Sequence, residues 1–242
     1  MPHGTPDWGL VGPKSVLYGL DDLGEHAVRA GAVPSWDRRG HVVFSDNFRE
    51  GLGAWYSLIS SADGIICPFT DQALSAPFCV KMVNGSGGAT FARMHHYLGY
   101  LYRGQCGLEL NIAFGVDIEY IKFGMYSRSP AARQFFYVRL TPITGDLAHG
   151  SDGIGWTTFA NLGALLCNID AWHNVKLVVD FGTGFFVKLI WEGTAIGMGA
   201  IPCGTAFALA PYYWRILIEN DSSTATQYEM RLDDVIITID EP

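Results

Sequence analysis

Positive charge, closely spaced cysteines and long apolar runs are all scarce in this sequence of 242 residues. It carries 16 Lys and Arg against 24 Asp and Glu, a net charge of −8, and no cluster of basic residues stands out along the chain. A phosphate backbone would be repelled at long range, so we expect no nucleic-acid partner. No apolar segment reaches the ~18–20 residues that a membrane-spanning helix needs. Residues 1–8 also lack the basic stretch and apolar run of a secretory signal, so we expect no membrane partner.

The cysteines are few, odd in number and widely spaced, without a CxxC pair. This pattern predicts neither a disulfide framework nor a zinc site. Their neighbours are apolar or small, which indicates free thiols in a reducing compartment. The five are Cys67, Cys79, Cys106, Cys167 and Cys203.

Apolar residues and glycine are plentiful: 49% of the residues are hydrophobic and there are 29 glycines. Residues 107–114 alternate between apolar and polar, as a strand buried on one face does. Residues 174–180 and 185–191 flank Phe181–Gly184, whose two glycines predict a β-hairpin. About a dozen such segments lie between residue 41 and the end of the chain, which predicts a single all-β sandwich of two sheets.

Residues 1–40 differ from the rest and are predicted to be an N-terminal arm with one short helix. Asp22 and Glu25 have capping-box spacing, and Gly31 can end the helix. A helix this short is unstable alone in water, so we expect it to dock on a neighbour. The predicted organisation is an arm over residues 1–40 and a β-sandwich domain over residues 41–242.

Three segments carry a family resemblance. Residues 172–184 (WHNVKLVVDFGTG) resemble the central hairpin of concanavalin A-like, or laminin-G-like, jelly rolls. Residues 45–48 with Trp55 behind them resemble the first strand of that fold, and residues 232–237 resemble its closing strand. The resemblance covers about residues 41–240. It implies an all-β, two-sheet antiparallel jelly-roll sandwich in which the first and last strands lie side by side.

The same resemblance implies a metal site. In many such modules, carboxylates from the first and last strands hold a structural Ca²⁺ ion, and Asp46, Asp233 and Asp234 fall at the matching positions. The alternative is that these carboxylates cap turns or accept backbone hydrogen bonds. His95 and His96 are adjacent, so on a strand they would face opposite sides and could not hold one ion together.

Glycosidases of the laminarinase type, which share this fold, carry Glu-x-Asp-x-Glu on one strand. Here the matching positions are Gly115, Asp117 and Glu119, and on a strand the two carboxylates would share a face. Retaining hydrolysis needs two carboxyl groups, one of them the nucleophile. Because glycine stands at the nucleophile position, we expect no enzymatic activity and keep an inactive or altered glycosidase as the third hypothesis.

Aromatic rings offer a sugar-stacking alternative, because flat rings fit the apolar faces of pyranoses. The stretches 144–156 and 202–214 are the predicted rims of a ligand groove. The candidate ligand-binding residues within them are Asp146, Asp152, Trp156, Tyr212 and Trp214.

Finally, residues 7–14 and 18–25 resemble leader segments of phage virion proteins. With the free cysteines and the arm, this favours a non-enzymatic structural protein of a phage particle, in capsid decoration or the tail. The expected partners are further copies of the chain in a homo-oligomer and other virion proteins. Such a protein is made in the host cytoplasm and ends in the virion. The alternative is a carbohydrate-binding, lectin-like module with a glycan partner.

Overall fold

The structure, a computed structural model, describes residues 41–71, 73–75, 77–99, 103–128, 133–151, 155–206 and 213–241. Within these ranges the regular structure is entirely β, without a helix. It follows that no helix among them is long and apolar enough to cross a membrane. The predicted arm over residues 1–40, with its short helix, lies outside the described residues.

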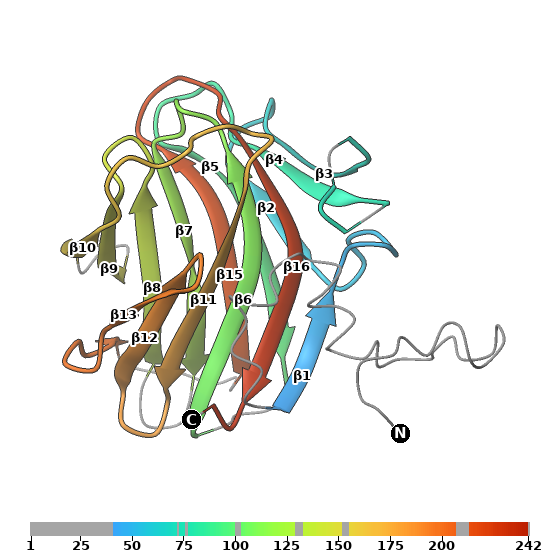
Figure 1. Cartoon of the computed structure of the whole chain (residues 1–242). Helices are drawn as coiled ribbons and strands as arrows, with labels where there is room; N and C mark the ends of the chain where they lie inside the picture. The colour runs from blue at the N-terminus through green and yellow to red at the C-terminus, as the bar shows by residue number, and fades with distance from the viewer. Residues whose placement is uncertain are drawn as a thin grey trace, which may run out of the picture.

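The described strands are ordered along the chain as follows (Figure 1). They are β1 His41–Asp46, β2 Tyr56–Ile59, β3 Ile65–Phe69, β4 Cys79–Val83, β5 Thr90–Leu98, β6 Gln105–Phe114, β7 Tyr120–Arg128, β8 Arg133–Thr141, β9 Asp146–Ser151, β10 Gly155–Asn161, β11 Trp172–Asp180, β12 Phe185–Trp191, β13 Thr194–Gly197, β14 Gly204–Ala206, β15 Tyr213–Ser222 and β16 Glu229–Ile239.

These strands form two antiparallel sheets packed face to face, which confirms the predicted jelly-roll sandwich. The back sheet has the order β13-β12-β11-β6-β16-β4-β3, with β1 paired to β16. The front sheet has the order β10-β9-β8-β7-β15-β5-β2, with β14 paired to β8. The predicted hairpin is β11–β12, and the first and last strands are neighbours as the resemblance implied.

The core lies between the two sheets and is filled by alternate residues of their strands. In β6 of the back sheet, Leu108, Leu110 and Ile112 are fully buried. In β7 of the front sheet, the alternate residues Ile121 and Phe123 face them in the same hydrophobic cluster. The intervening residues of every strand therefore point outward, so each sheet presents an outer face of its own. All five cysteines are free, as predicted.

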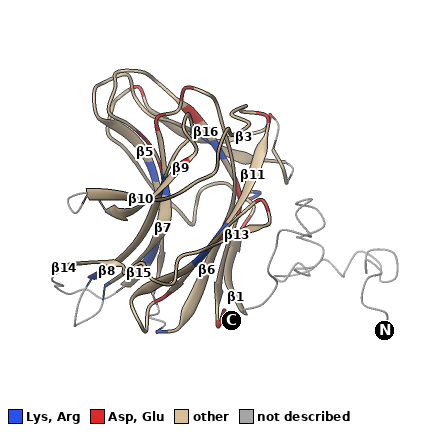
Figure 2. Cartoon of the chain, turned by 60° about the vertical axis from the view of Figure 1, so that its left-hand side comes forward, with Lys and Arg blue, Asp and Glu red and all other residues tan. Residues whose placement is uncertain are grey.

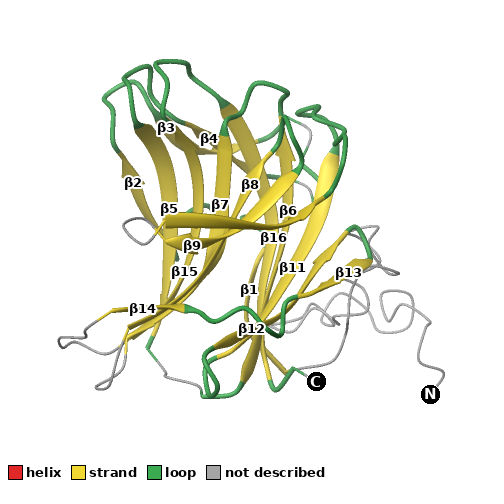
Figure 3. Cartoon of the chain, turned by 90° about the vertical axis from the view of Figure 1, so that its left-hand side faces the viewer, coloured by secondary structure: helices red, strands yellow, loops and turns green. Residues whose placement is uncertain are grey.

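The front sheet is curved. Its strands bend so that the outer face lies on the inside of the curve (Figure 2). The β9–β10 hairpin turns away from the other strands and crosses in front of them (Figure 3). Trp156 of this hairpin lies near Lys122 of β7 and Arg139 of β8, whose charged groups are 5.7 Å and 4.9 Å from its ring centroid.

Candidate functional site

The predicted calcium site is not formed by the residues that were expected to make it. Asp46 does lie beside the closing strand, opposite Val235. Its carboxylate accepts hydrogen bonds from the Phe48 amide at 2.7 Å and the Trp55 indole at 2.8 Å. Because its oxygens face donors from the protein, they are committed to the turn after β1. The described ranges contain no group of three or more His, Cys, Asp or Glu side chains arranged to hold a metal ion.

Asp233 and Asp234 lie in the middle of β16 and are also occupied by protein contacts. The Ser75 amide and hydroxyl each donate a hydrogen bond of 2.9 Å to Asp233. Burial, followed by the neighbouring charge of Asp234, raises the pKa of Asp233 to about 7. The register of β16 against β6 shifts here, and Asp234 has a φ of 45°. The two carboxylates therefore lie in a β-bulge, and the described residues bring no third His, Cys, Asp or Glu beside them.

Asp117 and Glu119 do not share a strand face, which corrects the basis of the glycosidase hypothesis. Residues 115–119 form the turn between β6 and β7, where the Ile118 amide reaches the Gly115 carbonyl at 3.5 Å. Ile118 is buried and anchors this turn. Glu119 accepts hydrogen bonds from Ser222 and Ser223, at 3.1 Å and 2.6 Å, and so ties the turn to the end of β15.

The predicted ligand-binding residues fall in different places. Trp214 is 2% exposed and packs in the core, so its ring is not available to a ligand at the surface. Asp146 starts β9, where Asn161 and Thr144 each donate a 2.7 Å hydrogen bond and lower its pKa. Trp156 lies on β10, among the outward rings of the front sheet. Asp152 and Tyr212 lie outside the described residues.

On the outer face of the front sheet, outward aromatic and basic side chains recur across neighbouring strands. The register places residues of neighbouring strands opposite each other in rows. We call this surface the front face, and it has four rows. The first row is Leu58, Arg93, Glu219, Lys122, Arg139, Ala148 and Thr158, and the second is Tyr56, His95, Leu217, Gly124, Tyr137, Gly150 and Trp156. The third row is Tyr97, Arg215, Tyr126 and Phe135, and the fourth is Tyr213, Arg128 and Arg133.

Aromatic rings cover much of the front face. Tyr56 is 55% exposed and Tyr97 is 47% exposed, at the β2–β5 side. Tyr97 meets Tyr213 edge to face, with ring centroids 5.4 Å apart. Trp156, at the opposite side, packs on the small cluster that includes Tyr126 and Tyr137. Two positions of the second row, Gly124 and Gly150, carry no side chain, and a Cβ at either would meet a neighbouring backbone carbonyl, so strands pack closely there.

Cationic side chains lie on these rings. The Arg139 guanidinium lies 4.4 Å from the Tyr120 ring centroid and 4.9 Å from that of Trp156. Arg215 lies 4.6 Å from the Tyr126 ring centroid. With Arg93, Lys122, Arg128 and Arg133, six of the 16 basic residues of the chain belong to this face. The sequence-based statement that the chain lacks a Lys/Arg cluster is therefore wrong for the folded protein, and Figure 2 shows Lys and Arg in blue on this sheet.

Two acidic residues of β15 lie beside these cations: Glu219 in the first row, and Asp221 two positions further along the strand. Glu219 is fully buried and pairs with Arg93 and with Lys122, the latter at 3.0 Å. Asp221 pairs with Lys122 at 2.8 Å. The other four arginines have no carboxylate within ion-pair distance among the described residues. The Nε atoms of Arg128, Arg133, Arg139 and Arg215 are buried without a hydrogen-bond acceptor in this part of the chain.

His95 stands in the second row and is 4% exposed, with both ring nitrogens unpaired within the described structure. Burial, then the nearby Arg215 and Arg93, lowers its pKa to about 3, so the ring is neutral at neutral pH. Its neighbours are rings: Tyr56 stacks on it and Tyr97 meets it edge-on. His96 turns the other way and stacks on Phe44, as expected for adjacent strand residues.

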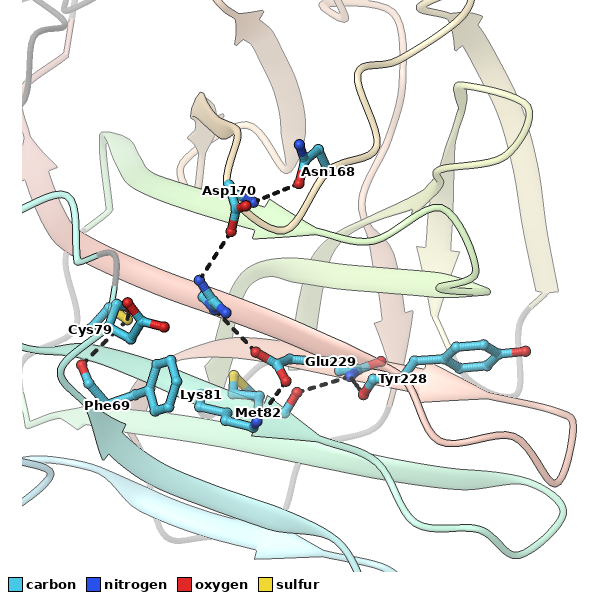
Figure 4. Close-up of polar contacts among 11 residues, drawn as sticks. Phe69, Cys79, Lys81, Met82, Asn168, Asp170, Tyr228 and Glu229 are labelled. Atoms are coloured by element: carbon cyan, nitrogen blue, oxygen red, sulfur yellow. Dashed lines mark hydrogen bonds and ion pairs between the residues drawn. The ribbon is translucent and has the colours of Figure 1, made fainter.

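The outer face of the back sheet differs, because its charges are paired with each other. Lys176 contacts Glu109 at 2.8 Å and Glu241 at 2.9 Å. Figure 4 shows a second chain of ion pairs, in which Arg231 contacts Asp170 and Glu229, and Glu229 also contacts Lys81. Charged groups that satisfy one another hold a structure in place, whereas buried donors without acceptors indicate a place for a ligand.

No protein-family model and no curated protein sequence matches this chain. The fold is nevertheless similar to several solved structures. A carbohydrate esterase of the Shiga toxin-encoding bacteriophage phi24B aligns at a TM-score of 0.52 and 13% identity, covering 84% of this chain and all of that one. The exoplasmic/lumenal domain of VIP36, in a form bound to Ca²⁺ and Man3GlcNAc, aligns at 0.51 and 10% identity, covering 84% and 94%.

A sialidase also aligns, at a TM-score of 0.52 and 12% identity, over 84% of this chain. This chain spans only 19% of the sialidase, so the similarity concerns one part of a larger protein. At such low identities the comparisons establish the jelly-roll sandwich and leave function to be argued from the site.

Proposed function

We propose that this chain is a non-enzymatic carbohydrate-binding protein whose ligand lies on the front face. The observation that carries the proposal is the set of exposed and half-buried rings on the inner side of a curved sheet. Tyr97, Tyr213 and Trp156 offer flat apolar surfaces, and arginine and tyrosine groups beside them offer hydrogen bonds. Sugars need this combination, because a pyranose has an apolar face and a rim of hydroxyls.

At the described positions that match the glycosidase motif, the carboxylates are not arranged as a catalytic pair, which supports binding rather than hydrolysis. Gly115 stands at the nucleophile position, and Asp117 and Glu119 lie in a turn instead of on a shared strand face. On the front face, Glu219 is buried and bonded to two cations. It is therefore not poised as a general acid. Among the solved structures of the same fold, the VIP36 domain was solved with Man3GlcNAc bound, which makes glycans the first ligands to test.

The experiment is a glycan-binding assay on the full chain with two single tryptophan variants. Trp156→Ala removes a ring from the front face, while Trp172→Ala removes an outward ring from β11 of the back sheet. We expect Trp156→Ala to weaken binding about tenfold, since a stacked ring contributes roughly 1–2 kcal/mol. Trp172→Ala should bind as the wild type does. Equal effects of the two substitutions would contradict the proposed surface.

We also propose a phage particle as the setting in which this binding occurs. The resemblance of residues 7–14 and 18–25 to virion leaders supports it, and a phage protein shares the fold. A glycan-binding module is useful on a particle that must meet a cell surface. Light scattering on the full chain tests the assembly part of this proposal, because we expect a multiple of 26.5 kDa. If the chain is a monomer at all concentrations, the proposal that it self-associates is wrong.

A further inference from the structure

The ligand class follows from how charge is distributed on the front face, if that face is the carbohydrate site proposed above. The four rows of the face carry six cations and one carboxylate, Glu219, and Asp221 beyond the first row pairs with Lys122, while the whole chain has a net charge of −8. At physiological salt, exposed charges are screened beyond about 8 Å, so a ligand on this face experiences the local cations more than the distant acids.

The strand register places like charges directly opposite each other twice. Between β7 and β8, Lys122 is opposite Arg139 and Arg128 is opposite Arg133. Like charges in directly opposite positions of a sheet destabilise it. For Lys122, the two acids of β15 offset the repulsion. Arg128 and Arg133 have no such partner in the described structure, and each has a buried Nε without an acceptor.

Unpaired arginine donors select the ligand by its chemistry. A guanidinium donates in a planar fork that matches carboxylate and sulfate oxygens. Neutral sugar hydroxyls would satisfy single donors but would not relieve the repulsion between Arg128 and Arg133. An anionic group between Arg128 and Arg133 accepts hydrogen bonds from both guanidinium groups and also relieves the repulsion between them. His95 adds a second buried group with unused hydrogen-bonding capacity in the same face.

We infer that the front face binds an acidic polysaccharide, with carboxylate or sulfate groups held by Arg128 and Arg133 and by the Arg139 region. Residues 122 and 128 are six apart on β7, which puts the two cationic rows about 20 Å apart at the usual rise of a strand. A single extended polymer would therefore contact both rows and lie across the rings between them. A free acidic monosaccharide would reach only one row and bind more weakly.

The test uses matched pairs of polymers on the full chain. Polygalacturonate and its methyl ester share a backbone and differ in charge, and dextran sulfate and dextran do the same for sulfate. Polyglutamate and single-stranded polynucleotide are anionic without being polysaccharides of this kind. We expect binding to polygalacturonate or dextran sulfate, or both, at least tenfold tighter than to the neutral partner, and weakening as salt is raised. The pair that responds identifies the acidic group.

The variant test replaces Arg128 and Arg133 together by Gln. The matched control is Arg103→Gln with Lys188→Gln, which removes the same charge from an exposed loop residue and from β12 of the back sheet. Each charged hydrogen bond contributes roughly 1.5 kcal/mol or more, so the Arg128/Arg133 variant should lose at least about tenfold in affinity and the control less than about twofold. Thermal unfolding of both variants establishes that they fold.

The outcomes separate this inference from the proposed function. Equal binding to charged and neutral polymers, unaffected by the Arg128/Arg133 variant, overturns the acidic ligand and leaves carbohydrate binding standing. Binding of polyglutamate or polynucleotide as tight as that of the acidic polymers shows a general polyanion surface and overturns the inference. Binding to none of the polymers overturns the acidic ligand, and the glycan-binding assay with the Trp156→Ala and Trp172→Ala variants then decides separately whether carbohydrate binding stands.

Discussion

Replacing Asp234 by Asn should stabilise the protein, and by more at pH 8 than at pH 4. Asp233 and Asp234 are adjacent and buried in β16, and burial together with the Asp234 charge raises the pKa of Asp233 to about 7. In the unfolded chain that carboxyl ionises near pH 4. Between about pH 4 and 7 the folded state therefore keeps a proton that the unfolded state releases, so stability falls as pH rises through this window.

The size of this effect follows from the shift. Each unit of pKa difference corresponds to about 1.4 kcal/mol, so the full difference of about three units is on the order of 4 kcal/mol above pH 7. Burial is the larger cause and Asp234 the second, so removing the Asp234 charge should return on the order of 1–2 kcal/mol at pH 8 and little at pH 4. Asn suits the position, since it tolerates the φ of 45° that Asp234 adopts.

Urea unfolding followed by tryptophan fluorescence, at several pH values from 4 to 8, measures this difference. Ser75→Ala is the control, because it should change the stability at pH 8 in the opposite direction. It removes the hydroxyl that donates to Asp233 and helps its ionised form, so stability at pH 8 should fall. If Asp234→Asn changes stability equally at all pH values, the coupling between the two carboxylates is not the cause and the reasoning is refuted.

Two further predictions concern the front face and the metal. Gly124→Ala should destabilise the protein by roughly 1–3 kcal/mol, because φ is 155° and a Cβ would lie 2.0 Å from the Phe136 carbonyl oxygen. Gly115→Ala, with nothing within 4 Å of its Cβ, should stay within about 0.5 kcal/mol, and similar losses for both would contradict this account of Gly124. Calcium and a chelator should leave the Tm unchanged, because Asp46 and Asp233 are held by protein donors; a clear rise with calcium would show a site that these contacts do not reveal.

The strands could be predicted from the sequence because each carries its pattern locally. Leu108, Leu110 and Ile112 alternate within one segment, and the glycines of residues 181–184 mark the turn of the β11–β12 hairpin. The sequence patterns did not single out β2, β3, β4, β5, β9, β10, β13 and β14, most of which are short. The stretch 144–156, predicted to be a groove rim, contains β9 and the start of β10.

The front face could not be predicted because its residues are distant in the sequence. Arg93, Arg139 and Arg215 lie on three strands, and only the pairing register brings their outward positions together. The same alternation explains the misplacement of Trp214. Its neighbours Tyr213 and Arg215 take the outward positions, so the indole between them enters the core.

The most direct test of the central claim, that the front face is the ligand surface, follows the tryptophan indole N–H resonances by NMR during addition of polygalacturonate or dextran sulfate. Trp156 lies on the front face, Trp172 on an outward position of the back sheet, and Trp214 in the core. We predict that the Trp156 signal shifts with saturation while those of Trp172 and Trp214 stay in place. A shift of Trp172 with Trp156 unchanged would place the ligand on the opposite sheet and contradict the account.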